Sequence, residues 1–146
     1  MDLIWIIPAS GLLTVVFVVY LIWDVLRRDT GTKEMQEIGG MIYEGAMAFL
    51  RRQYQTILML AIVAAVIIGA LIGYFGNDFD LGWRTAVAFL VGSGLSALSG
   101  FIGMYISVKS NVRTASAARR SLGEAITTAM RGGAVSGFLV VALSLI

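Results

Sequence analysis

Residues 57–75, ILMLAIVAAVIIGALIGYF, decide the fold class because they form 19 consecutive positions without a charged side chain. At about 1.5 Å per residue, a helix of this length crosses most of a hydrocarbon core roughly 30 Å thick. Charged residues make up 14% of the whole chain and hydrophobic residues 58%, whereas a soluble domain carries about 25% charged residues. The sequence therefore predicts an all-α, polytopic membrane protein.

Three further apolar stretches have the length of a membrane span. Residues 3–23 and 85–108 contain no charged side chain, and residues 125–146 contain only Arg131. Residues 76–84, GNDFDLGWR, are rich in turn-forming residues and are expected to connect two antiparallel helices. We predict a single transmembrane domain over residues 1–146, with four antiparallel helices at about 3–26, 34–75, 84–118 and 122–146.

The first apolar stretch could also be a secretory signal peptide. Such a peptide begins with basic residues, but this chain has Asp2 and no lysine or arginine before the apolar run. The run ends at Asp24, Arg27 and Arg28 rather than at a small-residue cleavage site. These features favour a retained membrane helix.

The charged segment 44–57, EGAMAFLRRQYQTI, leads directly into the second span. Apolar residues recur every three or four positions before it, at Met35, Ile38 and Ile42, and no proline or glycine pair interrupts residues 45–75. This pattern predicts one continuous helix, with Arg51 and Arg52 at the lipid headgroups. A separate interfacial helix, with a break at Gly39 and Gly40, is the alternative.

The distribution of basic residues predicts the orientation of the chain in the membrane. Five basic residues fall in 27–54 and four in 109–121, but the turn at 76–84 holds only Arg84. Because cytoplasmic connections are enriched in lysine and arginine, the N-terminus is expected outside and the first and third connections in the cytoplasm.

Small residues recur at intervals of four in three of the spans. Because membrane helices associate through close backbone contact, these stripes predict helix packing, with the third helix touching more than one neighbour. The stripes are Gly69 and Gly73; Gly92, Ser96 and Gly100; Ser99, Gly103 and Ser107; and Ala125, Ala129, Gly133 and Gly137.

The charged residues near the spans suggest structural contacts and no chemistry. Arg131 either lies near the cytoplasmic surface or needs a partner, of which Glu124 is the main nearby acid. Glu44 could form a surface salt bridge with Arg51, Arg113 or Arg119. The chain is still apolar at its last residue, which predicts that it is the front end of a longer protein.

Composition and motifs exclude most catalytic classes for this chain. It has no cysteine and no histidine, and it lacks phosphate-loop, zinc-protease and catalytic-triad patterns. We expect no catalytic, cofactor-binding or metal-binding residue in it. It also has no nucleic-acid-binding module, so nucleic acid is not an expected partner.

Three strings resemble signatures of the membrane-embedded pyrophosphatases, which are ion pumps driven by pyrophosphate hydrolysis. The second helix is similar to I-x-E-G-A-x-A-[FY]-L-x-R-Q-Y through Ile42, Glu44, Gly45, Ala46, Ala48, Phe49, Leu50, Arg52, Gln53 and Tyr54. The third resembles S-G-F-x-G-M-x-[IV] and N-x-R-T-x-x-A-R through Ser99, Gly100, Phe101, Gly103, Met104, Ile106, Asn111, Arg113, Thr114, Ala118 and Arg119. The fourth is similar to A-x-x-x-A-[FM]-R-[SG]-G-A-V-x-G-[FL] through Ala125, Ala129, Met130, Arg131, Gly132, Gly133, Ala134, Val135, Gly137 and Phe138.

This resemblance implies a pump of about sixteen helices in two rings that works as a homodimer on magnesium pyrophosphate, with K+ as a possible activator, and moves H+ or Na+. The first four helices would belong to the outer ring and support a catalytic core absent from this chain. Glu44, Arg52, Arg113, Arg119 and Arg131 are then structural candidates, and the last three are expected to pair with acids on helices absent from the chain. The alternatives are a self-contained four-helix scaffold or small oligomeric channel without enzymatic activity, and half of an inverted-repeat transporter.

Overall fold

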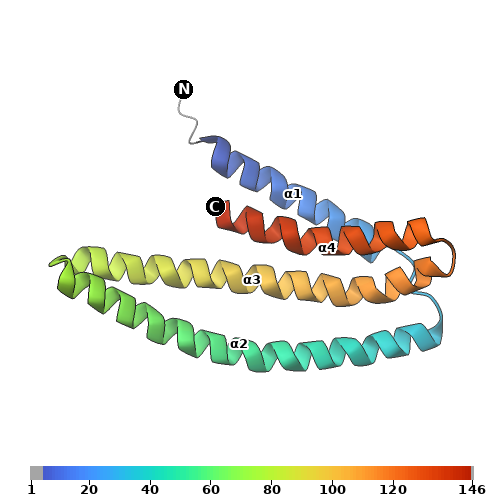
Figure 1. The fold of residues 1–146 in the computed structure, drawn as a ribbon, viewed down its shortest axis with the longest axis horizontal. Coiled ribbons are helices and arrows are strands. Elements are labelled where there is room, and N and C mark those ends of the chain that lie inside the picture. Colours follow the sequence, from blue (N-terminus) through green and yellow to red (C-terminus); the bar gives the residue numbers. More distant parts are fainter. Residues whose placement is uncertain (1–4, 146) are drawn as a thin grey trace. The chain divides into compact units, whose positions relative to one another are not determined.

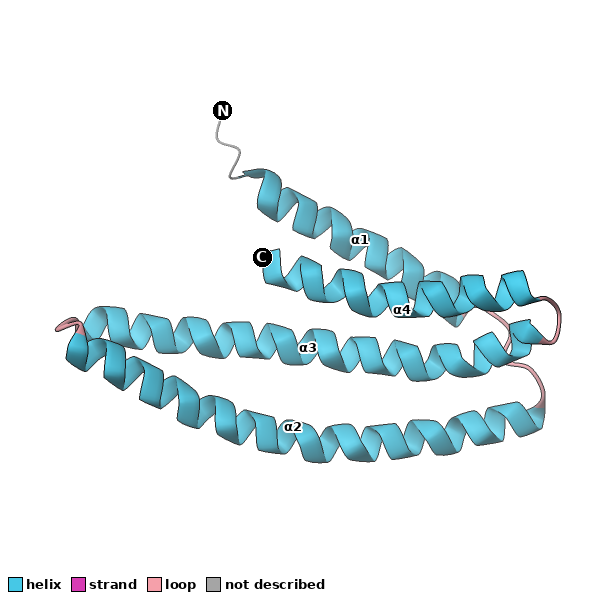
Figure 2. Ribbon diagram, viewed as in Figure 1, coloured by secondary structure: helices cyan, strands magenta, loops and turns pink. Residues whose placement is uncertain are grey.

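The computed structural model describes residues 5–145, which form four helices: α1 (Ile6–Leu26), α2 (Lys33–Phe75), α3 (Phe79–Ala118) and α4 (Leu122–Leu145) (Figures 1 and 2). Over this part of the chain, all four helices are long and apolar enough to cross a membrane. The predicted all-α, polytopic membrane fold is confirmed. Leu3, Ile4 and Ile146, which were expected to be helical, lie outside the described residues.

The second helix is continuous over 43 residues, as the periodicity predicted. It runs through Gly39 and Gly40 without a break, so the alternative of a separate interfacial helix is wrong. Gly39 faces the side chain of Val112 on α3, and a Cβ added there would overlap the Val112 methyl group. The glycine therefore serves close helix packing rather than a bend.

The connection between α2 and α3 is shorter than the expected turn at 76–84. It occupies residues 76–78, and α3 begins at Phe79. Asn77 adopts a left-handed conformation with φ 51°, which asparagine tolerates better than most residues. Asp78 Oδ1 then accepts hydrogen bonds from the backbone N–H groups of Asp80 and Leu81 at 2.9 and 3.1 Å. This N-terminal cap starts the helix within the polar sequence.

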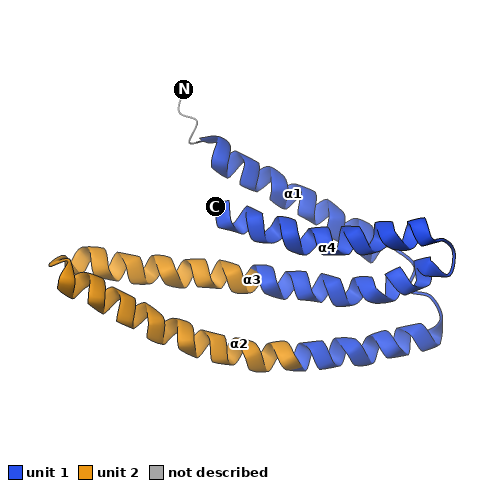
Figure 3. Ribbon diagram, in the orientation of Figure 1, with its two compact units in different colours: residues 1–48, 99–146 blue, residues 49–98 orange. Residues whose placement is uncertain are grey.

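The chain forms two compact units (Figure 3). One comprises residues 1–48 and 99–146 and contains α1, α4 and the adjoining parts of α2 and α3. The other comprises residues 49–98, a helical hairpin made from the remaining parts of α2 and α3.

The core of the first unit lies where α1, α3 and α4 meet. Its six buried apolar side chains are Val18, Leu21, Val25, Ile106, Val135 and Leu139. Inside a bilayer such contacts are stabilised by close packing rather than by removal from water, because lipid tails are equally apolar. Polar contacts between these helices consequently matter more than they would in a soluble bundle.

The hairpin of the second unit depends on a close backbone approach. A Cβ added at Gly82 would lie 2.5 Å from the carbonyl oxygen of Gly69 and 2.9 Å from the Cα of Gly73. The predicted packing role of Gly69 and Gly73 is confirmed. Farther along, the Tyr54 hydroxyl donates to the carbonyl oxygen of Ala97 at 2.7 Å.

Among the described residues, only some members of the other small-residue stripes are buried against a neighbouring helix. Ser99 and Gly103 are buried, but Gly92 has no neighbour within 4 Å of an added Cβ. On α4, the expected stripe is buried only at Ala125, whereas Gly133 and Gly137 are exposed. The buried face instead carries Thr128, Gly132, Val135, Leu139 and Ala142. This face is rotated by one residue, or about 100°, from the predicted one.

Candidate functional site

A buried carboxylate holds the first and fourth helices together. Asp24, near the end of α1, has a side chain only 1% exposed. Its Oδ1 accepts a hydrogen bond from Arg27 at 3.0 Å, and its Oδ2 accepts from Arg28 at 2.9 Å and from Arg131 of α4 at 2.6 Å. We call these four residues the Asp24 cluster.

The spacing of residues on α1 explains how the cluster forms. Arg27 and Arg28 follow Asp24 by three and four positions, which places all three on one side of the helix. Arg28 also donates from Nη1 to Thr128 Oγ1 at 2.9 Å, and this fully buried hydroxyl donates to the Glu124 carbonyl oxygen at 2.8 Å. The cluster therefore contacts two successive turns of α4.

The Asp24 cluster carries more positive than negative charge. Three guanidinium groups share one carboxylate, so two positive charges remain without a carboxylate partner within the cluster. Arg27 and Arg131 keep 57% and 37% of their side-chain surface exposed. Both can donate further hydrogen bonds to an anion.

A second polar contact joins the first connection to the end of α3. The Ser116 hydroxyl donates to Asp29 Oδ2 at 2.5 Å, and the Arg120 guanidinium donates to the same oxygen at 3.0 Å. The Ser116 hydrogen bond, with bonds from the Gly31 N–H and Arg120, lowers the pKa of the Asp29 carboxyl from 3.8. Hydrogen bonds to Glu124 and Asp29 raise the pKa of Arg120. This contact fixes the chain entering α2 against the chain leaving α3.

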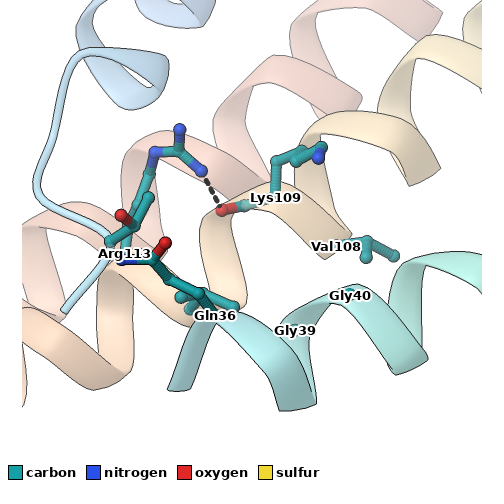
Figure 4. Close-up of a pocket in the computed structure, with 8 residues that line it drawn as sticks. Gln36, Gly39, Gly40, Val108, Lys109 and Arg113 are labelled. Carbon is teal, nitrogen blue, oxygen red and sulfur yellow. Dashed lines mark hydrogen bonds between the residues drawn. The ribbon is translucent and has the colours of Figure 1, made fainter. Parts of the chain in front are cut away.

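A pocket of about 210 Å³, lined by both polar and apolar groups, lies between α2 and α3 in the first unit. Figure 4 shows Gln36, Gly39 and Gly40 on α2 facing the segment of α3 that carries Lys109 and Arg113. Arg113 donates to the carbonyl oxygens of Lys109 and Leu26 at 2.7 and 2.9 Å. The Lys109 ammonium lies 4.3 Å from the centre of the Tyr43 ring. Both cations are thus held by neutral groups, so the pocket does not depend on an ion pair.

Within residues 5–145, no ion pair joins any two of the sequence-predicted site residues. Arg131 pairs with Asp24 rather than with Glu124. Its expected pairing with acids on helices absent from this chain stays a prediction. Arg113 is held by carbonyl oxygens rather than by an acid. Glu44 is exposed and makes no ion pair within residues 5–145. Arg52 and Arg119 are exposed, and their predicted roles stay predictions.

Sequence reasoning missed Asp24 and Thr128 as contact residues. The signal for Asp24 was available, because an acid at the end of an apolar stretch with arginines three and four positions later forms its own ion pairs. Thr128 gave no signal, since its burial depends on how α1 crosses α4.

The arrangement stabilises helix packing and has no recognisable catalytic geometry. Over the described residues, no group of three acidic, histidine or cysteine side chains is close enough to hold a metal ion. Both oxygens of Asp24 are occupied by arginines. The described residues therefore do not fit a magnesium site.

A comparison with protein-family models matches residues 12–146 to a family described as inorganic H+ pyrophosphatase. The chain is 51% identical over its full length to the K(+)-insensitive pyrophosphate-energized proton pump 2 of Moorella thermoacetica. It is 41% identical, over 99% of its length, to a K(+)-insensitive pyrophosphate-energized proton pump of Methanosarcina mazei. Over 88% of its length it is 37% identical to a protein of Clostridium tetani named as a K(+)-stimulated pyrophosphate-energized sodium pump.

These matches cover only part of each relative. The chain spans 20% of the length of the first two proteins and 18% of the third. No solved structure matches the chain significantly.

Proposed function

Because this chain belongs to the inorganic H+ pyrophosphatase family, we propose that it forms the supporting outer helices of a pyrophosphate-energised H+ or Na+ pump. The observation that carries the proposal is the combination of a family match over residues 12–146 with the absence of a metal-binding cluster among the described residues. Pyrophosphate hydrolysis, and the Mg2+ and K+ that assist it, would then depend on residues outside this chain.

Exposed small residues support a role in packing against further helices. Gly92 on α3 and Gly133 and Gly137 on α4 leave open space where a Cβ would stand. Membrane helices approach one another closely at such positions. Further helices of the complete pump, in the same subunit or in a second copy of a homodimer, would cover these faces, while the large apolar side chains elsewhere face lipid.

The Asp24 cluster would preserve the spacing of these outer helices. The ion pair that connects α1 to α4 is costly to open in a region of low polarity, because Arg131 would be left without a charge partner while Asp24 kept only Arg27 and Arg28 of its own helix. The chain would therefore act as a rigid brace rather than as a moving part of the transport cycle.

The proposal is tested by substituting Asp24 with Asn in the complete pump. We expect a lower yield of assembled protein, with the KM for magnesium pyrophosphate unchanged in the fraction that assembles. A changed KM at full yield would place Asp24 in the catalytic machinery and contradict the bracing role. Absence of any Mg2+-dependent release of phosphate from pyrophosphate by the unsubstituted protein would contradict the pump assignment itself.

The orientation with the N-terminus outside is a further part of the proposal. The chain contains no cysteine, so single cysteines can be labelled with a membrane-impermeant maleimide. Phe79→Cys, in the first turn of α3, should react from the outside. Gly123→Cys, where a side chain meets no neighbour within 4 Å, should react only after the membrane is opened. The reverse pattern would overturn the orientation.

A further inference from the structure

A row of exposed aromatic side chains leads away from the Asp24 cluster along α1. The centre of the Trp23 ring is 6.4 Å from that of Tyr20, and the Tyr20 ring is 6.3 Å from Phe17. Phe17 then meets Phe138 of α4 edge to face at 5.4 Å. These four rings, the aromatic row, are each 43–55% exposed.

The aromatic row borders a groove between α1 and α4 with a volume of about 320 Å³. Its lining includes Phe17, Tyr20, Met130 and Phe138, together with Arg131. Arg27 extends the cationic end of this surface, since its guanidinium carbon lies 4.3 Å from the centre of the Trp23 ring. The surface therefore has a positively charged end and an apolar end.

The dimensions of this surface match one leaflet of a bilayer. Phe17 and Arg27 are ten residues apart, or about 15 Å along a helix, which is half of a hydrocarbon core roughly 30 Å thick. Tyrosine and tryptophan prefer the membrane interface, and arginine side chains reach toward the headgroups. Trp23 and Tyr20 lie between the arginines and the fully apolar Phe17. This order, from charged to amphipathic to apolar side chains, matches the change from headgroups to hydrocarbon across a membrane interface.

Charge decides the kind of molecule that fits. The three arginines of the cluster face a single carboxylate whose two oxygens are already occupied, so an added anion gains attraction without displacing a partner. A phosphodiester supplies a negative charge and oxygen acceptors for guanidinium groups. A neighbouring protein helix fits less well, because helix contacts in membranes are enriched in small residues and this groove is lined mainly by large ones.

We propose that the groove between α1 and α4 binds an anionic phospholipid, with its phosphate at Arg131 and Arg27 and an acyl chain along the aromatic row. The lipid partly neutralises the excess positive charge of the Asp24 cluster and fills the groove beside the ion pair. The inference rests on the membrane location and on these contacts, and does not require pump activity.

The test uses photoactivatable lipids with a diazirine in one acyl chain. The full chain is reconstituted in vesicles of phosphatidylcholine and phosphatidylglycerol in equal parts, and a trace of either lipid carries the probe. We expect the phosphatidylglycerol probe to label peptides containing residues 17–23 and 130–138 several-fold more than the phosphatidylcholine probe.

Arg27→Gln provides the variant test, because it leaves the Asp24–Arg131 ion pair in place. It should lower the preference for phosphatidylglycerol about fivefold, the effect of one basic residue near an anionic surface. Arg84→Gln is the matched control, since Arg84 also lies near a tryptophan and pairs with an aspartate but belongs to the other unit. It should leave the preference unchanged.

Three results would overturn the proposal. They are equal labelling by both probes, an unchanged preference in Arg27→Gln, and no labelling of the groove. The last result would mean that a further helix or a second copy of the chain occupies it.

Discussion

Arg131 Nη1 on α4 donates a hydrogen bond to Asp24 Oδ2 on α1 at 2.6 Å, although 107 positions separate the two residues in the sequence. In an apolar environment, packing alone stabilises the association of α1 with α4 only weakly, because each helix exchanges lipid contacts for similar protein contacts. The hydrogen-bonded ion pair adds stability to this association. The pairing also explains why an arginine is tolerated within the apolar sequence of α4: its charge is matched from the neighbouring helix.

Asp24→Asn should destabilise the packing of α1 against α4. Removing the carboxylate charge leaves Arg28 and Arg131 without an ionic partner while the side-chain volume is preserved. We expect a loss of roughly 2–3 kcal/mol, below the ~3–5 kcal/mol of a fully buried pair, because both arginines are partly exposed. Thermal unfolding of the full chain in detergent measures it.

Asp80→Asn is the matched control for this change. Asp80 also pairs with an arginine, Arg84 at 2.6 Å, but both side chains are more than half exposed. Its substitution should therefore cost only about 0–1 kcal/mol. Equal losses at the two positions would mean that burial of Asp24 adds nothing.

The sequence was sufficient to predict the helices because their signals are local. The apolar runs defined the four spans, and the spacing of Met35, Ile38 and Ile42 predicted that α2 continues through Gly39 and Gly40. The turn before α3 was predicted too long because its polar residues belong to a capped first helical turn.

The contacts between helices at the candidate site could not be predicted because they depend on how the helices cross. Glu124 was the expected partner of Arg131, yet it lies on the same helix and pairs with Arg120 instead. The buried face of α4 was also misjudged, because Ile106 and Ser110 of α3 pack beside Val135 and Gly132 rather than beside the predicted small-residue stripe. Periodicity identifies a stripe on a helix, but the neighbouring helix determines which stripe is covered.

Thr128→Val should cost about 1–2 kcal/mol despite the similar shape of the two side chains. The substitution removes the acceptor of the Arg28 Nη1 hydrogen bond at a fully buried position. Thr127→Val is the control, because the exposed Thr127 hydroxyl donates a hydrogen bond to the Gly123 carbonyl oxygen of its own helix. A similar midpoint of thermal unfolding in both variants would argue against the role of Thr128.

Gly82→Ala should loosen the hairpin of residues 49–98. The added methyl group would lie 2.5 Å from the Gly69 carbonyl oxygen, and backbone atoms cannot move aside as a flexible side chain can. We expect a loss of about 1–3 kcal/mol, as for overpacking in a protein core.

Gly45→Ala tests whether this loss comes from contact rather than from the type of substitution. Among the described residues, nothing beyond the adjoining backbone of α2 lies within 4 Å of an added Cβ at Gly45, so the change should be neutral or stabilise the helix by up to about 1 kcal/mol. Denaturation of both variants in mixed detergent micelles measures the difference. A loss in Gly45→Ala as large as that in Gly82→Ala would remove the packing explanation.

The Asp29 contact should make stability depend on pH in the acid range. Hydrogen bonds from Ser116, Gly31 and Arg120 favour the charged carboxylate and hold its pKa below 3.8. A carboxyl with a depressed pKa in the folded state stabilises the fold fully above its unfolded pKa. This contribution is lost as the pH falls from 3.8 through the lower pKa of the folded protein.

Asp29→Asn should therefore unfold at a lower temperature than the unsubstituted chain at neutral pH, and this difference should shrink below pH 3.8. Ser116→Ala removes the largest cause of the shift, so the pKa of Asp29 should rise toward its ordinary value. The acid-dependent loss should then be smaller and should be complete at a higher pH than in the unsubstituted chain. Unfolding temperatures recorded from neutral pH to below 3.8 for all three chains distinguish these cases. A difference between the unsubstituted chain and Asp29→Asn that persists undiminished in acid would show that the Asp29 contact does not depend on its charge.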